Sequence, residues 1–236
     1  MSVMQSLKPP FNPELMEILN QFIEDISQHD LSQIKYHNVE NARQWWNLPL
    51  REDDGYYYSS EEHLDYMKNE KDYKLHPNDD GFAEATMGIN MITPGPNVPD
   101  AIKQIVYKVN SKLNAYFCSK FSAVNMYYPK GGFMGWHNNN NCPGWNILMS
   151  YTNGDHEGYF MYQEPGTGEF IKLEDNQNIM NGWTIKVGYF GGKDEPDRIF
   201  WHTARVYDNE RLTLAYVIPD EHKEFWDMMV EDIQDA

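Results

Sequence analysis

The sequence predicts a mainly β fold, a sandwich or barrel of the jelly-roll kind, with helices packed against it. From residue 121 to 219 the chain divides into at least seven short segments rich in β-branched and aromatic residues. Gly, Pro, Asn and Asp residues of the kind found in turns separate these segments. Apolar residues at helical spacing precede and follow this region. Closely spaced strands of this kind are typical of antiparallel jelly rolls.

The flanking helices are predicted from their start signals and apolar stripes. Asn12-Pro13-Glu14 offers a capping side chain, a proline at the first helical position and an acidic residue, and apolar residues follow at helical spacing. A second helix is expected from about 99 to 117, where apolar residues form one stripe. The tail, 220–236, is expected to form a closing helix.

Between the first two helices, residues 36–93 show no regular pattern and carry several acidic runs. Solvated loops are expected there, and this stretch is the candidate for a lid, lined by Trp45, Trp46 and Tyr56–Tyr58, because long functional loops gather at site mouths. No interdomain linker is visible, so residues 1–236 are expected to form a single domain. Its expected parts are a helical and loop-rich support over 1–120, a β core over 121–219 and a C-terminal helix over 220–236.

The composition of the chain argues against several classes of partner. The 236 residues include 19 Lys and Arg against 36 Asp and Glu, a formal net charge of -17, which argues against a nucleic-acid partner held by general phosphate attraction. The two cysteines give no disulfide framework. Neither a membrane-spanning apolar run nor a signal-peptide core is visible, so no membrane partner and a cytoplasmic location are expected.

Two of the eight histidines, His137 and His202, lie at the edges of predicted strands among aromatic residues. A single histidine in such a strand is usually a hydrogen-bonded core residue. Asn139, however, follows His137 by two positions, so in a strand both side chains point to the same side. His202 from a neighbouring strand could complete a set of three. Two histidines and one oxygen ligand, with three positions open, are typical of mononuclear non-haem Fe(II) oxygenases.

Arg211 and Thr213, which follow His202 in the chain, are candidates for binding an anion. A turn over 208–210 would fold the next segment back along the His202 strand, with Arg211 and Thr213 facing the interior together. A buried arginine needs an anion. The planar carboxylate of a diacid matches the forked donors of a guanidinium.

These residues occur in an order that resembles the Fe(II)/2-oxoglutarate-dependent oxygenases. The region from about Phe121 to Pro219 is similar to their double-stranded β-helix core, above all in the prolyl-hydroxylase-like and demethylase-like branches. The resemblance covers roughly 100 residues, and its motifs are specific as an ordered set rather than singly. The matching residues are Tyr127-Tyr128-Pro129-Lys130-Gly131, His137-Asn138-Asn139, His202 and Arg211-Leu212-Thr213.

The resemblance implies Fe(II) on His137, Asn139 and His202, and 2-oxoglutarate as the cosubstrate whose far carboxylate pairs with Arg211 and Thr213. It also implies that the enzyme hydroxylates a substrate while the cosubstrate is converted to succinate and CO2. Further cosubstrate contacts are implied for Asn125, Tyr127 and Tyr151, with Tyr128 as a competing assignment for Tyr127.

Asn139 departs from the family pattern, which has an acidic residue there, and an amide oxygen is a neutral ligand. Three interpretations stay open: Asn139 ligates the metal, or the position is left for another ligand as in the halogenating branch, or the site is altered and binds without turnover. Asp155 or Glu157 could supply a carboxylate instead.

Other functions remain open as well. A jelly-roll module that binds ligands without iron would fit the aromatic content, but has no need for Arg211 and Thr213 together. A cupin metalloenzyme would usually have several histidines close together on one strand. The expected substrate is a small molecule or a protein side chain, preferably basic given the acidic chain. Trp136, Trp145 and Trp201 are expected to pack rather than to bind substrate.

Overall fold

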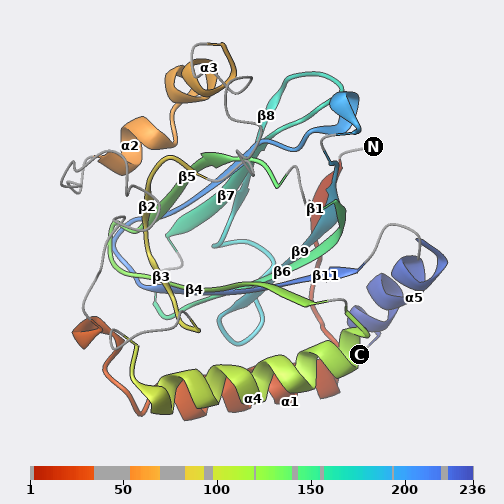
Figure 1. The fold of residues 1–236 in the computed structure, drawn as a ribbon. Coiled ribbons are helices and arrows are strands. Elements are labelled where there is room, and N and C mark those ends of the chain that lie inside the picture. Colours follow the sequence, from red (N-terminus) through yellow and green to blue (C-terminus); the bar gives the residue numbers. More distant parts are fainter. Residues whose placement is uncertain are drawn as a thin grey trace.

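Two antiparallel β-sheets face each other and form a sandwich with helices on its outer sides (Figure 1). This agrees with the predicted mainly β fold with packed helices. None of the helices in the ranges that follow is long and apolar enough to cross a membrane. The computed structural model describes residues 3–34, 54–69, 83–92, 98–119, 121–139, 143–154, 157–192, 194–218 and 223–235.

The larger sheet has six strands, and each strand pairs antiparallel with its neighbours. The smaller sheet has five strands, also antiparallel. The order in the larger sheet is β1 (Met4–Ser6), β9 (Trp183–Phe190), β6 (Gly144–Thr152), β11 (Arg211–Ile218), β4 (Phe121–Tyr128) and β3 (Ile89–Asn90). The order in the smaller sheet is β2 (Thr86–Met87), β5 (Phe133–His137), β10 (His202–Val206), β7 (Gly158–Gln163) and β8 (Phe170–Glu174).

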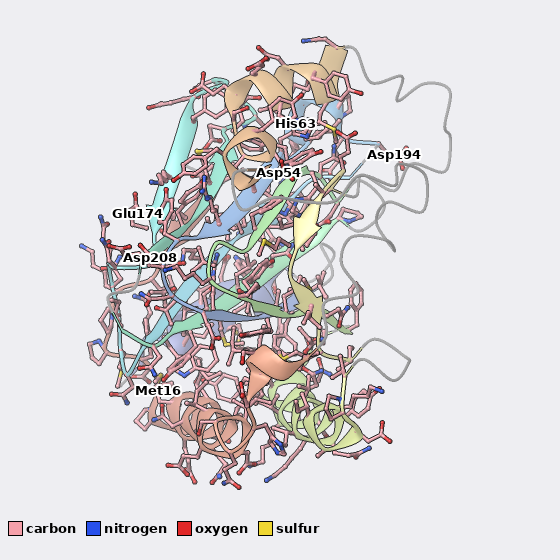
Figure 2. All side chains as sticks on the ribbon, turned by 90° about the vertical axis from the view of Figure 1, so that its left-hand side faces the viewer. Met16, Asp54, His63, Glu174, Asp194 and Asp208 are labelled. Carbon is pink, nitrogen blue, oxygen red and sulfur yellow. The ribbon has the colours of Figure 1, made fainter. Side chains whose placement is uncertain are left out.

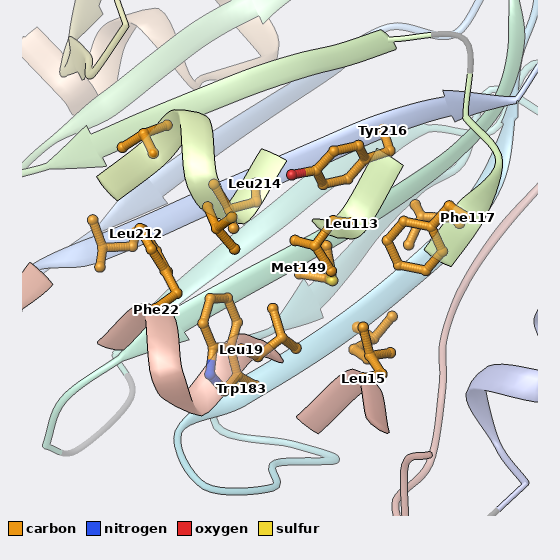
Figure 3. Close-up of a cluster of buried hydrophobic side chains, with 14 of the residues drawn as sticks. Leu15, Leu19, Phe22, Leu113, Phe117, Met149, Trp183, Leu212, Leu214 and Tyr216 are labelled. Carbon is orange, nitrogen blue, oxygen red and sulfur yellow. The ribbon is translucent and has the colours of Figure 1, made fainter. Parts of the chain in front are cut away.

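Two long helices, α1 (Pro13–Ile26) and α4 (Asp100–Phe117), cover the outer side of the larger sheet (Figure 1). The capping signal acts as predicted, because the Asn12 side chain accepts a hydrogen bond from the backbone N–H of Glu14 at 2.9 Å. Figure 3 shows the resulting core, in which α1 and α4 meet the sheet. Its members include Leu15, Leu19, Phe22, Leu113, Phe117, Met149, Trp183, Leu212, Leu214 and Tyr216.

Strand alternation decides which residues face the space between the sheets. Leu212 and Leu214 of β11 pack against the helices. Their neighbours Arg211, Thr213 and Ala215 therefore point toward the smaller sheet, because successive side chains of a strand point to opposite sides. Ala215 lies in a second core that joins the inner sides of both sheets.

Short helices cover the smaller sheet at the opposite end of the molecule, α2 (Asp54–Tyr58) and α3 (Glu61–Asn69) (Figure 1). Figure 2 shows Asp54 and His63 of these helices far from Met16 of α1. Part of the stretch expected as solvated loops, 36–93, is therefore helical, and its buried residues explain why. Leu64 and Met67 pack with Trp136 and Trp201. Trp45 and Trp46 lie outside the described residues.

The C-terminal helix α5 (Lys223–Ile233) is present as predicted and lies beside the end of β11 (Figure 1). Trp226 of this helix stacks on Trp145, with ring centres 5.0 Å apart. Trp136 donates a hydrogen bond from its indole N–H to the backbone oxygen of Ser60 at 2.7 Å. All three tryptophans of interest, Trp136, Trp145 and Trp201, thus pack within the fold, as expected. Two short 3-10 helices complete the described elements, Leu31–Gln33 and Pro196–Arg198.

The short strands β2 and β3 join the two sheets. β2 pairs with β5 of the smaller sheet, and β3 pairs with β4 of the larger sheet. Gly88 lies between them, and a Cβ there would come within 2.9 Å of Met126 and 3.0 Å of the Tyr128 ring. The absence of a side chain allows this segment to cross closely over β4.

Candidate metal and diacid site

His137 and His202 meet on the smaller sheet. His137 ends β5, His202 begins β10, and the two residues are directly paired in register. Their ring centres lie 3.9 Å apart at 54°, and the residues are 7% and 4% exposed. Residues 65 positions apart are thus brought together by strand pairing, as the sequence predicts.

Each histidine ring is oriented by a backbone carbonyl. His137 Nδ1 lies 2.8 Å from the Gly135 oxygen, and His202 Nδ1 lies 3.0 Å from the Phe200 oxygen. A carbonyl only accepts, so Nδ1 carries the proton and Nε2 keeps its lone pair. Histidines that bind metals are commonly held in this way.

Burial keeps both rings neutral. It lowers the pKa of His137 to about 4, against the opposing effect of its backbone hydrogen bonds. Burial is the main reason that the pKa of His202 lies well below its usual range, and the neighbouring His137 lowers it further. Neutral imidazoles are the form that binds a metal ion, so no proton has to be displaced at neutral pH.

Asn139 lines the same cavity as the two histidines, a cavity of about 610 Å³ between the sheets. It is half-buried, two residues beyond the end of β5. The three sequence-predicted metal ligands therefore share one wall. In the described part of the chain, no three His, Cys, Asp or Glu residues are placed to hold an ion together. The donors that fit a metal here are two imidazoles and an uncharged amide oxygen.

The alternative carboxylates do not join this group. Glu157 is exposed and lies next to β10 at its far end, where its backbone oxygen accepts from the N–H of Tyr207 at 3.1 Å. Four residues of strand, about 13 Å, separate that end from His202. Asp155 lies outside the described residues.

Arg211 points between the sheets and is almost fully buried. Its Nη2 donates to Ser150 Oγ at 2.8 Å, and its Nη1 donates to the backbone oxygen of Tyr159 at 3.2 Å. Its Nε lies 3.4 Å from Asp175 Oδ2. Thr213 lies beside it, with Oγ1 3.5 Å from Ser150 Oγ. The predicted Arg and Thr pair thus shares one buried polar pocket.

A second buried cation, Lys186 of β9, lies in the same pocket and was missed by the sequence analysis. Its Nζ donates to Asp175 Oδ1 at 2.7 Å and to Thr184 Oγ1 at 2.9 Å. Burial lowers the pKa of Lys186, and Asp175 opposes this shift. Among the described residues, one carboxylate thus faces two cations, Lys186 and Arg211. The signal in the sequence is a lysine in a strand whose other residues, apart from Thr184, are apolar.

Tyr128 also faces this pocket. It is the β4 partner of Arg211 in register, and the guanidinium lies 5.9 Å from the centre of its ring. Burial raises the pKa of Tyr128 to about 12, although Arg211 opposes the shift. Its hydroxyl is therefore neutral and can donate a hydrogen bond.

The structure does not bring Asn125, Tyr127 and Tyr151 to this pocket. Tyr127 and Tyr151 both pair with Leu212, and Asn125 pairs with Leu214, so all three share the side that faces the helices. The reason is strand alternation, which turns adjacent residues of β4 to opposite sides. Two of them form hydrogen bonds there: the Tyr127 hydroxyl donates to Glu210 at 2.6 Å, and Asn125 Nδ2 donates to Ser122 Oγ at 2.8 Å.

The chain matches no protein-family model and no curated protein. Among solved structures it is similar to a prolyl-4-hydroxylase from Pseudomonas putida, with 15% sequence identity. The similarity covers 57% of this chain and 68% of that chain, with a TM-score of 0.31. A likeness at this level carries no argument about function, which has to be inferred from the residues themselves.

Proposed function

We propose that this chain is an Fe(II)- and 2-oxoglutarate-dependent oxygenase of the hydroxylase type. The proposal rests on two groups of side chains that lie between the two sheets. Two neutral, oriented imidazoles lie at one end of β10, and a pocket with two cations and one carboxylate lies toward the other end. A metal fits the first group, and the far carboxylate of a diacid fits the second.

We propose that the two sheets together form a double-stranded β-helix. Four strands of the larger sheet, β9, β6, β11 and β4, lie against four strands of the smaller sheet, β5, β10, β7 and β8. Along the chain these eight strands cross repeatedly from one sheet to the other. Eight strands in two sheets are what a jelly roll requires.

The spacing of the two groups suits a short diacid. Tyr162 is the β7 partner of His202, and Arg211 donates to the backbone oxygen of Tyr159 on the same strand. Three residues of strand correspond to about 10 Å. A diacid with its 2-oxo acid end at the histidines and its other carboxylate at Arg211 would span the interior.

In this proposal His137, Asn139 and His202 hold the metal, which with the bound 2-oxo acid supplies the oxidising chemistry. Arg211, Lys186, Thr213 and Tyr128 bind the far carboxylate and fix the position of the diacid. Both histidines are almost fully buried, so they reach the metal position from the inner side of the sheet. Asn125, Tyr127 and Tyr151 are left out of the cosubstrate set.

Asn139 makes the two binding events dependent on each other. Because its amide is uncharged, the protein ligands leave the full charge of the metal without compensation. The 2-oxo acid carboxylate would be the only anionic ligand among these groups. We therefore propose that metal and diacid bind cooperatively, each raising the affinity of the protein for the other.

The test is an anaerobic titration of the purified protein with Fe(II) and 2-oxoglutarate, followed by the visible charge-transfer band of the chelate. Arg211→Met should abolish binding of the diacid. The variant should still fold, because Lys186 and Asp175 remain as a balanced pair. Arg198→Met, at a half-exposed arginine outside the site, is the matched control. Wild-type protein that binds neither ligand would refute the proposal, and binding without succinate release in air would indicate an impaired relative.

A further inference from the structure

The cavity of about 610 Å³ beside the histidines is lined mainly by apolar side chains. They come from the inner sides of both sheets and include Val124, Met126, Met134, Leu148, Phe190 and Ala215. Its volume lies within the range of about 300–1,000 Å³ typical of small-molecule sites. The segment that carries β2 and β3 contributes Ala83, Thr86 and Asn90 to the wall.

Apart from the two histidines, which would hold the metal in the function proposed above, the polar side chains of this wall are amides and one hydroxyl. Among the described residues that line the cavity there is no Asp, Glu, Lys or Arg, although the chain contains 36 acidic and 19 basic residues. The polar side chains are the two histidines, three asparagines and one threonine. Asn146 already donates to the Gly144 oxygen at 3.0 Å. Away from the histidines, a charged group would lose its hydration here without gaining a side chain of opposite charge.

We infer that this cavity binds an uncharged, mainly apolar small molecule, with the amides of Asn90 and Asn146 as the polar contacts. On the function proposed above, on which this role rests, that molecule is the substrate. Its apolar part would lie next to His202, whose ring packs 4.8 Å from the ring of Phe190. The basic substrate expected from the acidic composition does not suit this wall, because the acidic residues lie elsewhere.

The test uses two probes of the same shape, neutral phenylbutanamide and cationic phenylbutylamine, titrated by calorimetry into protein without metal or diacid. The amide should bind at least about tenfold more tightly than the amine, since a buried charge without a partner costs more than this factor. Val124→Asp places a carboxylate in the half-buried wall and should reverse the preference. Ala123→Asp, at an exposed residue of the same cavity, tests the reversal if the first variant does not fold.

An anionic probe, phenylbutanoate, is titrated into Arg211→Met, so that the guanidinium cannot bind it, and should not bind. Met228→Asp, at a residue 66% exposed on α5, is the control and should leave all affinities unchanged. Equal binding of amide and amine, or no response to either cavity variant, would overturn the inference.

The assay separates this inference from the proposed function. If the amide binds but adds no succinate release in the presence of Fe(II) and 2-oxoglutarate, the cavity assignment stands and the oxygenase proposal fails for this ligand class. If metal and diacid bind while the amide does not, the oxygenase proposal stands and the cavity assignment fails.

Discussion

Asn139 is the residue at which the proposed metal site lacks a negative charge. Asn139→Asp should tighten Fe(II) binding, because the new carboxylate compensates part of the metal charge. Changes that only affect the orientation of ligands alter metal affinity by about 10–100-fold, so an increase of at least about tenfold is expected. The factor by which 2-oxoglutarate increases the metal affinity should be smaller in this variant. Anaerobic equilibrium dialysis with and without the diacid measures both effects.

Asn153→Asp is the control for this change, at an exposed residue beyond the end of β6. It alters the net charge of the protein equally without reaching the cavity. If both variants leave the metal affinity unaltered, the third ligand is not residue 139.

The charge balance among Arg211, Lys186 and Asp175 gives a prediction about stability. Asp175→Asn leaves Lys186 and Arg211 buried without a carboxylate and should lower the free energy of unfolding by about 3–5 kcal/mol. Lys186→Met leaves Arg211 and Asp175 as a pair and should cost much less. Urea unfolding of the two variants measures the difference. Equal losses would show that the pocket is already balanced by another group.

At the scale of single elements, alternation along β4 separates two adjacent tyrosines. Tyr128→Phe should weaken 2-oxoglutarate binding about five- to tenfold, the value of one hydrogen bond of about 1 kcal/mol. Tyr127→Phe is the matched control and should leave the affinity unchanged, because its hydroxyl donates to Glu210 on the other side of the sheet. The measurement is diacid affinity by calorimetry. A loss in the Tyr127 variant alone would reverse the assignment.

The same alternation shows how far the sequence can predict this structure. The helices α1 and α4 follow directly from apolar periodicity and from the capping residue Asn12. His137 was predicted at the edge of a strand, but the extent of that strand, β5, was not predicted, because Gly135 within it and Gly132 before it interrupt the apolar pattern. In the structure a Cβ at Gly135 would lie 3.0 Å from the Ala85 oxygen, so the glycine permits the approach of a neighbouring segment.

The candidate site could be predicted where it depends on the order of residues along the chain, but not where it depends on the packing of side chains. That His137, His202 and Arg211 lie in one interior was predicted from their order and spacing along the chain. Which of Tyr127 and Tyr128 faces inward depends on the phase of β4, which no motif determines. The contact between Lys186 and Asp175 depends on side-chain directions near the β8–β9 connection, so no local pattern indicates the pair.

At the scale of the whole molecule, the buried histidines make stability depend on pH. An unfolded histidine takes up a proton near pH 6.5, whereas the lowered pKa values keep the folded, metal-free pair neutral. The unfolded state therefore binds more protons as the pH falls. The free energy of unfolding should decrease between pH 7 and about 5.5 by about 1 kcal/mol for each histidine. Urea unfolding at the two pH values measures this loss.

His137→Leu should reduce the pH dependence of the free energy of unfolding by the contribution of one histidine. His29→Asn, in the turn after α1, is the control for a histidine outside the site. The same slope in all three proteins would show that other groups cause the acid sensitivity.

The crossing segment of β2 and β3 has a further consequence for the molecule. Each of these strands ends one sheet of the sandwich, and each is only two residues long. An open strand edge offers unpaired backbone groups to other chains, and proteins often protect such edges with short strands. One stretch of ten described residues, 83–92, thus covers β4 and β5 where both would otherwise be exposed. Loss of this cover would leave two adjacent edges available for intermolecular pairing, so aggregation would accompany any opening of the sandwich on this side.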